Sequence, residues 1–493
     1  MRRKTLVFRA DGDATTGLGH LYRMFSLVEM VKITYDFVFL TRSSSPISVV
    51  PRIYNVKTIP GAVAKVEEPN WIAANYPPQS HSVIADGYHF DSKYQKRIKE
   101  LGFKLVYIDD LANEEMFADL VINHSPGLYE SNYLKQPYTK FALGTSYALL
   151  RPSFLELAKQ EREIDKMNTA FVCFGGADPY DLTSMAVKAL LRICSVTKIN
   201  VVLGGTYKHT ELYNLSEEDL KSITIYKNLS EEALISIMLQ CDFAIAPAST
   251  ILYELCCVKM PILCGYYVEN QKNIYKAMSD ANAIYKGDNF SKAVGNDFNK
   301  MISKLLNDNE KSTKIQNQNK MFDGRSSNRL IGMINKLHFN LREAVNEDMR
   351  TIFEWSNDPD VRNNSFSPEP IAIEVHKEWF KNTLNNNNSL LLIACINDIP
   401  AGLIRYEKKN DFSTVGILIS KAFRGQGLAS QLLEKSAALY FNKFNLPIHA
   451  YIMKQNLLSI KSFEKANYKY YKDEIIKTSH SFVYKLEKAD VKK

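Results

Sequence analysis

Short segments rich in β-branched and aromatic residues alternate with amphipathic segments over the first two thirds of the chain, and this alternation constrains the fold most. It predicts parallel sheets with helices on both faces. The series breaks near residues 150–154 and restarts, which predicts two Rossmann-like lobes, about 1–155 and 156–338, with a ligand cleft at the carboxyl ends of the strands. The predicted strands are Thr5–Arg9, Asp36–Leu40, Val83–Ala85, Lys104–Ile108 and Leu120–Ile122, then Ala170–Phe174, Ile199–Leu203, Ile223–Tyr226, Phe243–Ala246 and Ile262–Cys264.

The pattern changes after Lys336. From 341 to 493 the order reads strand, helix, helix and then adjacent strands. The clearest hairpin joins Leu390–Ile396 to Ala401–Tyr406 through Asn397-Asp398. A chain of 493 residues exceeds what one hydrophobic core organises. The sequence therefore predicts an α/β region of two lobes, 1–338, followed by a small α+β domain, 341–493.

Composition excludes several classes of protein. No run of about 18 apolar residues is present, so no membrane span is expected. The basic start leads directly into a short strand-like run and lacks the apolar stretch of a signal peptide, so we expect a cytoplasmic protein. A net charge of +8 suits anionic ligands. Because no dense Lys/Arg patch with interleaved aromatics occurs, no nucleic-acid partner is expected.

Cysteine spacing argues against metal or disulfide roles. The seven cysteines form no C-x-x-C pair, and their number is odd. We therefore predict buried, reduced thiols and no bound metal. The cysteines are Cys173, Cys194, Cys241, Cys256, Cys257, Cys264 and Cys395.

A glycine-containing loop follows the first predicted strand and enters a helix near Leu21. It holds Gly12, Gly17 and Gly19 and ends at His20. Glycines permit sharp turns and close backbone approach, and helix N-termini favour anions. Gly17 and Gly19 form only a G-x-G pair, and the third glycine of the G-x-G-x-x-G dinucleotide fingerprint is absent, so NAD binding is not predicted. His20 at this helix start is either catalytic or a solvated or capping side chain.

Three loops of the second lobe place small or polar residues after predicted strands. The serine–threonine pair at one helix start could cradle a diphosphate, and a glutamate one turn later could hold ribose hydroxyls. Equally, the serine could be an ordinary N-cap with an acidic first turn behind it. Together the three loops predict a UDP-sugar site. Their residues are Gly176, Ser249, Thr250, Glu254, Asn270 and Gln271.

Several of these motifs occur together in one known family. They are Arg9-Ala10-Asp11, Gly17-Leu18-Gly19-His20 with Arg23, Tyr147-Ala148-Leu149-Leu150-Arg151-Pro152, Gly175-Gly176-Ala177-Asp178-Pro179, Ser249-Thr250 with Glu254, and Asn270-Gln271. With them, residues 1–338 resemble the UDP-sugar hydrolase of pseudaminic acid biosynthesis. The resemblance implies a glycosyltransferase-B-like fold, akin to the enzyme that adds GlcNAc to lipid II. It also implies hydrolysis of UDP-2,4-diacetamido-2,4,6-trideoxy-β-L-altropyranose to UDP and free sugar.

The resemblance assigns roles to these residues. His20 would position or deprotonate the attacking water, and Tyr88 would contribute from the opposite wall. Attack at the anomeric carbon with loss of UDP is an inverting displacement, and helix-start amides would stabilise the diphosphate without a metal. Asp11 and Asp13 would orient His20 or contact the sugar. The substrate-binding residues would be Arg9, Asp11, Gly19, Arg151, Gly176, Ser249, Thr250, Glu254, Asn270 and Gln271.

A second glycine-containing loop lies between the predicted strand Val415–Ser420 and the predicted helix Gln431–Leu439. Its R-x-x-G-x-A pattern suits a pyrophosphate, because successive N–H groups and a helix N-terminus can bind one. Residues 341–487 thereby resemble GCN5-related N-acetyltransferases (GNAT), and an asparagine 27 residues beyond the loop matches the one that contacts their cofactor. The resemblance implies acetyl-CoA as co-substrate. Its binding residues would be Arg424, Gly425, Gln426, Gly427, Ala429 and Asn456.

One residue departs from the acetyltransferase pattern. Many relatives have a tyrosine acid seven residues after this asparagine, whereas this chain has Phe463. Either Tyr468 or a nearby tyrosine serves, or water reprotonates the CoA thiolate. The segment Trp355–Pro359 resembles the sugar N-acetyltransferases of this superfamily, and His376 and Trp379 would line the acceptor side. Core packing explains the tryptophans equally well.

The two resemblances describe consecutive steps of one pathway. The acetyltransferase would acetylate the 4-amino group of a UDP-4-amino-4,6-dideoxy sugar, and the hydrolase would release the diacetamido sugar from UDP. One alternative is a glycosyltransferase that uses a UDP-sugar, fused to an acetyltransferase. Another is that one of the domains is a catalytically inactive binding module.

Overall fold

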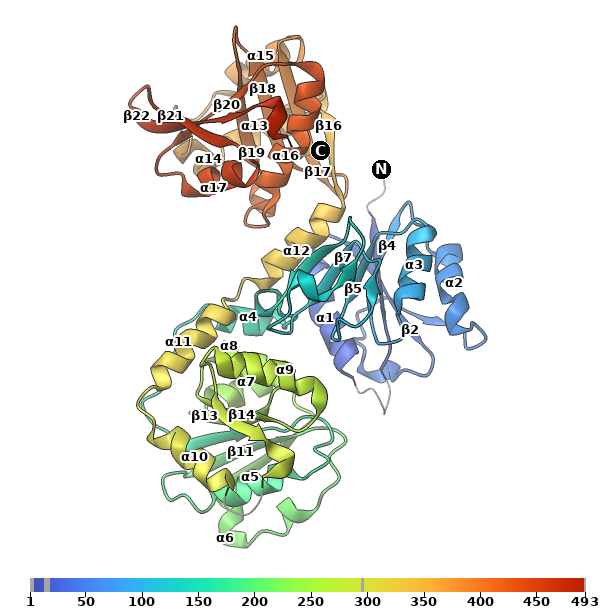
Figure 1. Cartoon of the computed structure of the whole chain (residues 1–493), viewed down its shortest axis with the longest axis vertical. Helices are drawn as coiled ribbons and strands as arrows, with labels where there is room; N and C mark the ends of the chain where they lie inside the picture. Colours follow the sequence, from blue (N-terminus) through green and yellow to red (C-terminus); the bar gives the residue numbers. More distant parts are fainter. Residues whose placement is uncertain (1–3, 13–17, 294–296, 492–493) are drawn as a thin grey trace. The chain divides into compact units, whose positions relative to one another are not determined.

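The structure is a computed structural model that describes residues 4–12, 18–293 and 297–491 (Figure 1). The chain divides into two compact units, which meet between Leu330 and Ile331. This division lies within helix α12 (Ser326–Leu337), eight residues before the boundary drawn from the sequence. Each unit is described by itself.

The first lobe of the N-terminal unit is built on a parallel sheet of seven strands in the order β3-β2-β1-β4-β5-β7-β9. Its central strands are buried along nearly their whole length, as in sheets with helices on both faces. Its strands are β1 (Thr5–Ala10), β2 (Asp36–Arg42), β3 (Val56–Ile59), β4 (His81–Asp86), β5 (Leu105–Ile108), β7 (Leu120–Asn123) and β9 (Lys140–Leu143), with the short pair β6 (Glu115–Met116) and β8 (Leu134–Lys135). Its helices are α1 (Gly19–Val31), α2 (Glu68–Asn75), α3 (Ser92–Glu100) and α4 (Pro152–Leu157).

The second lobe repeats this architecture with a six-stranded parallel sheet, in the order β12-β11-β10-β13-β14-β15. Its strands are β10 (Thr169–Val172), β11 (Lys198–Leu203), β12 (Ile223–Lys227), β13 (Phe243–Pro247), β14 (Ile262–Tyr266) and β15 (Tyr285–Asn289). Its helices are α5 (Leu182–Leu190), α6 (Glu217–Leu220), α7 (Glu231–Leu239), α8 (Thr250–Val258), α9 (Lys272–Asp280), α10 (Asp297–Asn307) and α11 (Lys311–Met321). The two Rossmann-like lobes predicted from the alternating pattern are confirmed.

The C-terminal unit is a mixed sheet of seven strands in the order β16-β17-β18-β19-β20-β22-β21, with an apolar cluster on each face. Its strands are β16 (Phe339–Glu343), β17 (Ser389–Ile396), β18 (Ile399–Lys408), β19 (Ser413–Ile419), β20 (Ile448–Met453), β21 (Lys469–Ile476) and β22 (Ser479–Leu486). Its helices besides α12 are α13 (Met349–Ser356), α14 (Pro359–Asn363), α15 (Ile373–Leu384), α16 (Leu428–Lys443) and α17 (Leu457–Lys465). The predicted α+β class is confirmed.

The hairpin predicted in this unit forms between β17 and β18. Its two turn residues, Asn397 and Asp398, both have positive φ, 51° and 63°. Two positive φ values define the type I′ turn, whose twist matches that of the flanking strands, and asparagine and aspartate tolerate this conformation best after glycine. The turn chemistry visible in the sequence therefore sets the register of the hairpin.

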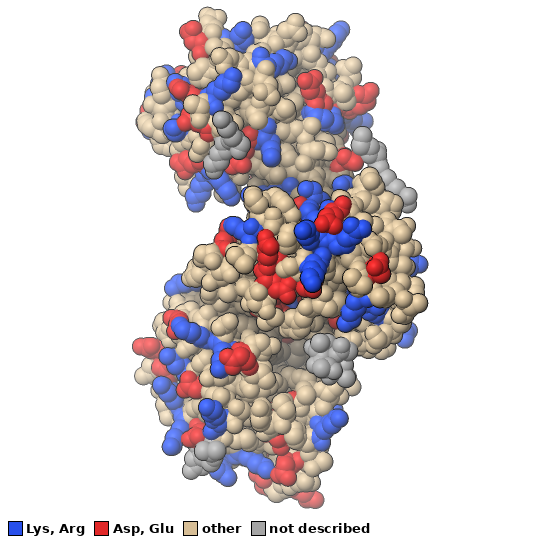
Figure 2. All heavy atoms as spheres, turned by 45° about the vertical axis from the view of Figure 1, so that its right-hand side comes forward, with Lys and Arg blue, Asp and Glu red and all other residues tan. Residues whose placement is uncertain are grey.

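Surface charge, cysteine burial and helix hydropathy can each be compared with the expectations from the sequence. On the face drawn in Figure 2, Lys and Arg side chains are interspersed with Asp and Glu side chains in both units. Six of the seven cysteines are buried, as expected, but Cys194 is exposed because it lies in the turn that follows α5, so its predicted burial is wrong. No helix in the described part of the chain is long and apolar enough to cross a membrane.

Candidate active sites

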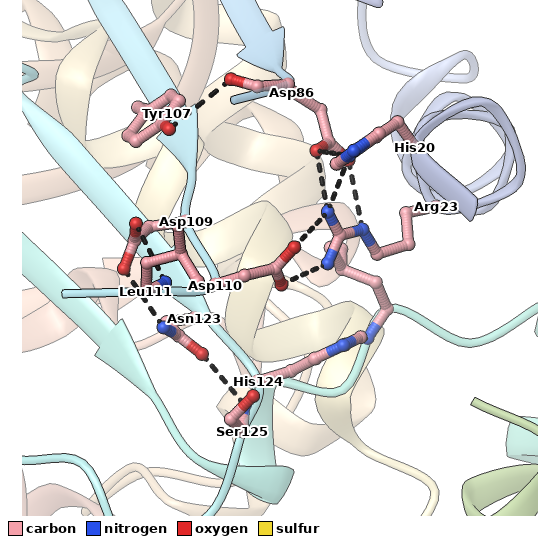
Figure 3. A network of polar contacts seen from close by, with 12 residues as sticks. His20, Arg23, Asp86, Tyr107, Asp109, Asp110, Leu111, Asn123, His124 and Ser125 are labelled. Atoms are coloured by element: carbon pink, nitrogen blue, oxygen red, sulfur yellow. Dashed lines mark hydrogen bonds and ion pairs between the residues drawn. The ribbon is translucent and has the colours of Figure 1, made fainter. Parts of the chain in front are cut away.

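The first site lies where three neighbouring strands of the first lobe end. In the register of the sheet, Asp86 at the end of β4 is level with Ala10 of β1 and Ile108 of β5. Helix α1 begins at Gly19, so His20 projects from its first turn toward this edge. His20 Nδ1 lies 2.6 Å from Asp86 Oδ1 (Figure 3). Arg23 Nη2 also lies 2.9 Å from Nδ1, so the donor and acceptor roles at this nitrogen depend on the tautomer. In the tautomer whose Nδ1–H donates to the Asp86 carboxylate, Nε2 is left to accept a hydrogen bond.

Arg23, one turn further along α1, links two acidic side chains at this edge. Its Nε and Nη2 donate to Asp86 at 3.0 and 2.7 Å, and Nη2 also donates to Asp110 at 3.0 Å (Figure 3). A second bond joins Nη1 to Asp110. Burial alone would raise the pKa of Asp110, but the charge and hydrogen bonds of Arg23 lower it to about 2. The guanidinium therefore holds both carboxyl groups in fixed positions around His20.

Tyr88 lies on the other side of the histidine. Its ring is perpendicular to that of His20, with 4.8 Å between the ring centroids. Burial raises the pKa of Tyr88, and so does the charge of Asp110. The phenol therefore keeps its proton at neutral pH. Its hydroxyl donates a hydrogen bond to Asp110, and the residue is half exposed, so the phenol oxygen can accept a hydrogen bond from a ligand.

His124 closes the far end of the network. Burial, followed by the charge of Arg23, lowers its pKa to about 4, so the ring is neutral. Its Nδ1 accepts a hydrogen bond from the amide of Leu149 at 3.2 Å, and its carbonyl accepts one from Tyr253 of the second lobe at 3.3 Å. His124 thus links two segments that follow it in the chain, one in each lobe of the unit.

Arg9 and Asp11, both expected to bind substrate, are held by contacts within the protein. Arg9 is completely buried and its Nε donates to Glu68 at 2.6 Å, so it stabilises the lobe interior instead of contacting a substrate. Asp11 accepts from Arg9 and from the amide of Arg42, and these contacts hold its pKa well below the usual range despite burial. Orientation of His20 falls to Asp86. Asp13, the other expected partner, lies outside the described residues.

The sequence-predicted residues of the second lobe meet at one edge of its sheet. Strands β10, β13 and β14 are neighbours, and the three candidate loops follow them directly. Gly176 is exposed after β10, Ser249 precedes α8, and Asn270 is exposed after β14. The side chain of Ser249, the N-cap of α8, accepts no capping bond, and Thr250 beside it is exposed. This edge suits an anionic ligand.

Glu254 and Arg151 form an ion pair across the two lobes of the unit. Arg151 Nη2 and Nε both donate to Glu254 Oε1, at 2.7 and 3.2 Å, so Oε2 is left for another donor. Burial raises the pKa of Glu254, and the nearby Arg151 opposes that shift. Gln271 differs from Asn270, since it is buried and its Oε1 accepts from the amide of Tyr267 at 3.0 Å. It shapes the loop that presents Asn270.

A third arrangement lies in the C-terminal unit, where β19 and β20 separate. These parallel strands pair only at Ser413–Ile448 and Thr414–His449, and beyond these pairs the ladder ends. The loop that follows β19 has φ values of +76° at Gly425 and +68° at Gly427. A residue with a Cβ would be strained at both positions. The loop leads directly into the N-terminus of α16. Its backbone amides and the first amides of the helix together form a cradle that suits a diphosphate.

Comparison with protein families identifies this unit. The Acetyltransferase (GNAT) domain family matches residues 338–469. Residues 338–469 form a GNAT acetyltransferase domain. Among solved structures, aminoglycoside acetyltransferase AAC(6')-Ib in complex with coenzyme A matches 31% of this chain and 96% of its own, at 17% identity and a TM-score of 0.28.

Three curated proteins are similar in sequence. An uncharacterized protein of Methanocaldococcus jannaschii is 26% identical over 93% of this chain and 95% of its own length. The spore coat polysaccharide biosynthesis protein SpsG of Bacillus subtilis is 25% identical over 56% of this chain and 80% of its own. The UDP-2,4-diacetamido-2,4,6-trideoxy-β-L-altropyranose hydrolase of Campylobacter jejuni is 25% identical over 54% of this chain and 93% of its own. The chain therefore combines a region similar to sugar-biosynthesis proteins with a GNAT domain.

Within the GNAT domain, the loop side chains are bound by the protein and leave the backbone to a ligand. Arg424 pairs with Asp358 and Asp360, both at 2.8 Å, and so fastens the loop to the start of α14. Gln426 Oε1 accepts from Asn335 at 2.6 Å. The side chains of Arg424 and Gln426, expected to bind acetyl-CoA, therefore hold the loop in shape. Ala429, partly exposed on the first turn of α16, has its amide among those that form the cradle.

The expected acid and acceptor residues lie largely in the core. Tyr468 is 3% exposed, it packs against Phe463, and burial raises its pKa well above the usual value. Burial of Tyr468 argues against it among the three alternatives for protonating the thiolate, and favours a nearby tyrosine or water. His376 is buried beside Trp379, with 5.2 Å between ring centroids, so core packing accounts for both. Asn456 caps α17, where its Oδ1 accepts from the amide of Ser459 at 3.1 Å.

No group of three or more His, Cys, Asp or Glu side chains in the described ranges is arranged to hold a metal ion. Asp86, Asp110 and His124 were not among the residues expected in the site. Their one common signal is position, since each lies within two residues of the end of a predicted strand of the first lobe. Acidic residues and histidines at the carboxyl ends of parallel strands are the signal that would have found them.

Proposed function

We propose that this chain is a bifunctional nucleotide-sugar enzyme. Its GNAT domain transfers an acetyl group from acetyl-CoA to the 4-amino group of a UDP-4-amino-4,6-dideoxy sugar. Its N-terminal unit hydrolyses UDP-2,4-diacetamido-2,4,6-trideoxy-β-L-altropyranose to UDP and the free sugar. The observation that carries the hydrolase proposal is the His20–Asp86 pair at the carboxyl edge of the first sheet. The similarity to the Campylobacter jejuni hydrolase supports it.

The geometry around His20 suits general-base catalysis of hydrolysis. With the proton on Nδ1 directed to Asp86, Nε2 takes a proton from water as its oxygen attacks the anomeric carbon. The bond from that carbon to the UDP oxygen breaks, and UDP leaves from the opposite face, which inverts the configuration. The imidazolium that forms is stabilised by Asp86. Tyr88 lies beside His20 and its hydroxyl donates to Asp110, so its oxygen can accept a hydrogen bond from the sugar or from the attacking water.

The second lobe suits the leaving group. Negative charge develops on the diphosphate as the glycosidic bond breaks. The first amides of α8 and the Ser249 and Thr250 hydroxyls stabilise that charge without a metal ion. Glu254 Oε2, left by the Arg151 pair, accepts hydrogen bonds from the ribose hydroxyls. Gly176 and Asn270, exposed on the two neighbouring loops, contact the rest of the nucleotide.

The GNAT domain suits amine acetylation. Acetyl-CoA supplies the acetyl group as a thioester. The amides of the Gly425–Ala429 loop hold the diphosphate, and the separated edges of β19 and β20 accommodate the pantetheine arm. The amine nitrogen forms the new bond to the acetyl carbon as the bond from that carbon to the CoA sulfur breaks. Solvent takes the proton that the amine loses, and, since Tyr468 is buried, water or another tyrosine protonates the thiolate. The chain contributes mainly positioning to this step.

The test supplies the purified chain with UDP-4-amino-4,6-dideoxy-N-acetyl-β-L-altrosamine, with and without acetyl-CoA, and follows products by NMR and mass spectrometry. We expect release of UDP and the diacetamido sugar only when acetyl-CoA is present. His20→Ala should lower UDP release on the order of 10³-fold and leave acetylation unchanged. The matched control is His81→Ala, since His81 lies at the opposite end of the same sheet. Acetylation without UDP release would refute the hydrolase half of the proposal.

A second candidate substrate class has a specific observation in its favour. SpsG, named for spore coat polysaccharide biosynthesis, matches this chain at the same 25% identity as the hydrolase. A different activated sugar in the same cleft would still use His20 and the start of α8. A panel of nucleotide sugars assayed for His20-dependent release of nucleotide distinguishes the two. Turnover of another sugar at a higher kcat/KM than the diacetamido sugar would favour this second class.

A further inference from the structure

The end of helix α12 lies against the diphosphate loop of the GNAT domain. Asn335 Nδ2 donates to Gln426 Oε1 at 2.6 Å, and Gln431 Nε2 donates to the carbonyl of Lys336 at 3.3 Å. A Cβ on Gly332 would come within 2.3 Å of the Gln426 carbonyl oxygen. Only a glycine permits so close an approach between helix and loop. Residues 331–337 are thus packed firmly on the loop, although the family match begins at residue 338.

This packing places a cation beside the cradle. Lys336 Nζ lies 3.4 Å from the position that a Cβ on Gly427 would occupy, and Cε lies 3.9 Å from it. Gly427 is the N-cap of α16, so the ammonium group adjoins the end of the helix where free amides and the positive end of the dipole meet. The ammonium therefore faces the place where the diphosphate of acetyl-CoA is proposed to bind.

Lys336 has no anionic contact in the structure. Among the residues that the structure describes, none makes a hydrogen bond or an ion pair with its Nζ. Burial lowers the pKa of Lys336, the neighbouring Lys465 lowers it further, and Glu434 opposes that shift from a distance. A half-buried cation held next to a second lysine and a helix N-terminus is electrostatically unfavourable until an anion arrives.

We propose that Lys336 is a coenzyme-binding residue that pairs with the diphosphate of acetyl-CoA on the Gly425–Ala429 loop. The inference rests on the proposed acetyl-CoA-dependent function. It adds a coenzyme-binding residue from helix α12, which precedes the residues matched by the GNAT family. Asn335 and Gly332 act as positioning residues, because they fix α12 on the loop and thereby aim Lys336.

The test measures binding to the full chain by isothermal titration calorimetry at low and moderate salt. The probes are CoA, dephospho-CoA, which lacks the 3′-phosphate, and pantetheine, which lacks the diphosphate. The variants are Lys336→Gln and Lys336→Arg, with Lys435→Gln as the matched control, since Lys435 is exposed further along α16. We expect Lys336→Gln to raise the Kd for CoA and for dephospho-CoA about tenfold and leave pantetheine unchanged. Lys336→Arg and Lys435→Gln should bind CoA as the wild type does.

The thermal stability of Lys336→Gln distinguishes a role of Lys336 in binding from a role in folding. Because Lys336 is an unpaired cation, Lys336→Gln should leave the Tm without ligand equal to or slightly above that of the wild type, whereas a structural role would lower it. An equal Kd for CoA in Lys336→Gln and wild type, in a wild type that binds CoA, would overturn this inference alone. If Lys336→Gln weakened the binding of pantetheine as much as that of CoA, the inference would also be overturned. The same holds if Lys336→Gln weakened the binding of CoA but not that of dephospho-CoA. A wild type that binds no CoA would overturn the acetyltransferase proposal and this inference with it.

Discussion

The candidate site around His20 and the candidate site at Gly427 are made from different parts of their residues. The first consists of side chains: a histidine and an arginine of one helix, with carboxyl groups from the ends of two strands. The second consists of backbone: amides presented by two glycines with positive φ and by a helix start, with the loop's side chains turned to the protein. A side-chain site can change chemistry by single substitutions, whereas a backbone site tolerates them unless they alter φ.

The largest expected effect tests whether the first site depends on one carboxylate. Asp86→Asn should lower the rate of UDP release on the order of 100-fold, because an amide can donate to His20 Nδ1 and so favour the wrong tautomer. Acetylation by the same preparation should be unchanged. The measurement is kcat for UDP release over a range of pH, with exposed Asp36→Asn as the control. Full activity in Asp86→Asn would mean that Asp86 does not orient His20.

The second effect concerns buried histidines near the first site. The pKa of His124 and that of His89 are lowered to about 4, chiefly by burial and then by a neighbouring arginine. The unfolded chain binds these protons near pH 6.5, so stability is full above that pH and is lost as the pH falls toward 4. Each histidine should reduce the free energy of unfolding by about 2 kcal/mol between pH 7 and pH 5.

Urea unfolding at the two pH values measures this loss. His124→Gln should remove about one histidine's share of the pH dependence, because glutamine does not titrate. His81→Gln, at the opposite end of the sheet, is the control. A pH dependence unaltered in His124→Gln would show that the imidazole is not held neutral by its surroundings.

The smallest effect tests the backbone character of the second site. Gly427→Ala should raise the Kd for CoA about tenfold, because φ of +68° strains a residue with a Cβ by roughly 1–2 kcal/mol. Ala422→Ser, at an exposed position just before the same loop, should bind CoA as the wild type does. The measurement is calorimetric titration of the full chain. An unchanged Kd for CoA in Gly427→Ala would mean that the second site does not depend on its backbone conformation, and the contrast with the side-chain site at His20 would fail.

The elements and loops that local sequence describes were predicted well. The alternating pattern led to both parallel sheets, and Asn397-Asp398 led to the β17–β18 hairpin. The edge strands β3, β9 and β15 were not predicted, because they are short or half exposed and lack a buried apolar run. The glycines of the loop after β19 do adopt the positive φ that their pattern implied.

The side-chain partners were predicted poorly, and Arg9 and Asp86 show why. Arg9 belongs to a motif that suggests a ligand contact, yet strand β1 is central in the sheet, so its side chain is buried against Glu68. Asp86 stands 66 residues from His20 in the chain and meets it only because β4 lies beside β1. Nothing in the local sequence states which strands are neighbours.

By itself, the sequence determined the fold class, the two glycine loops, His20 at a helix start and the absence of the usual acetyltransferase tyrosine at Phe463. Only the tertiary structure decided that Asp86 orients His20, that Tyr468 is buried and that Lys336 lies beside Gly427. The physical reason is how far apart in the sequence the interacting residues lie. Backbone conformation is set within a few residues by steric limits on φ and by hydrogen bonding, whereas side-chain pairs depend on the packing of distant elements.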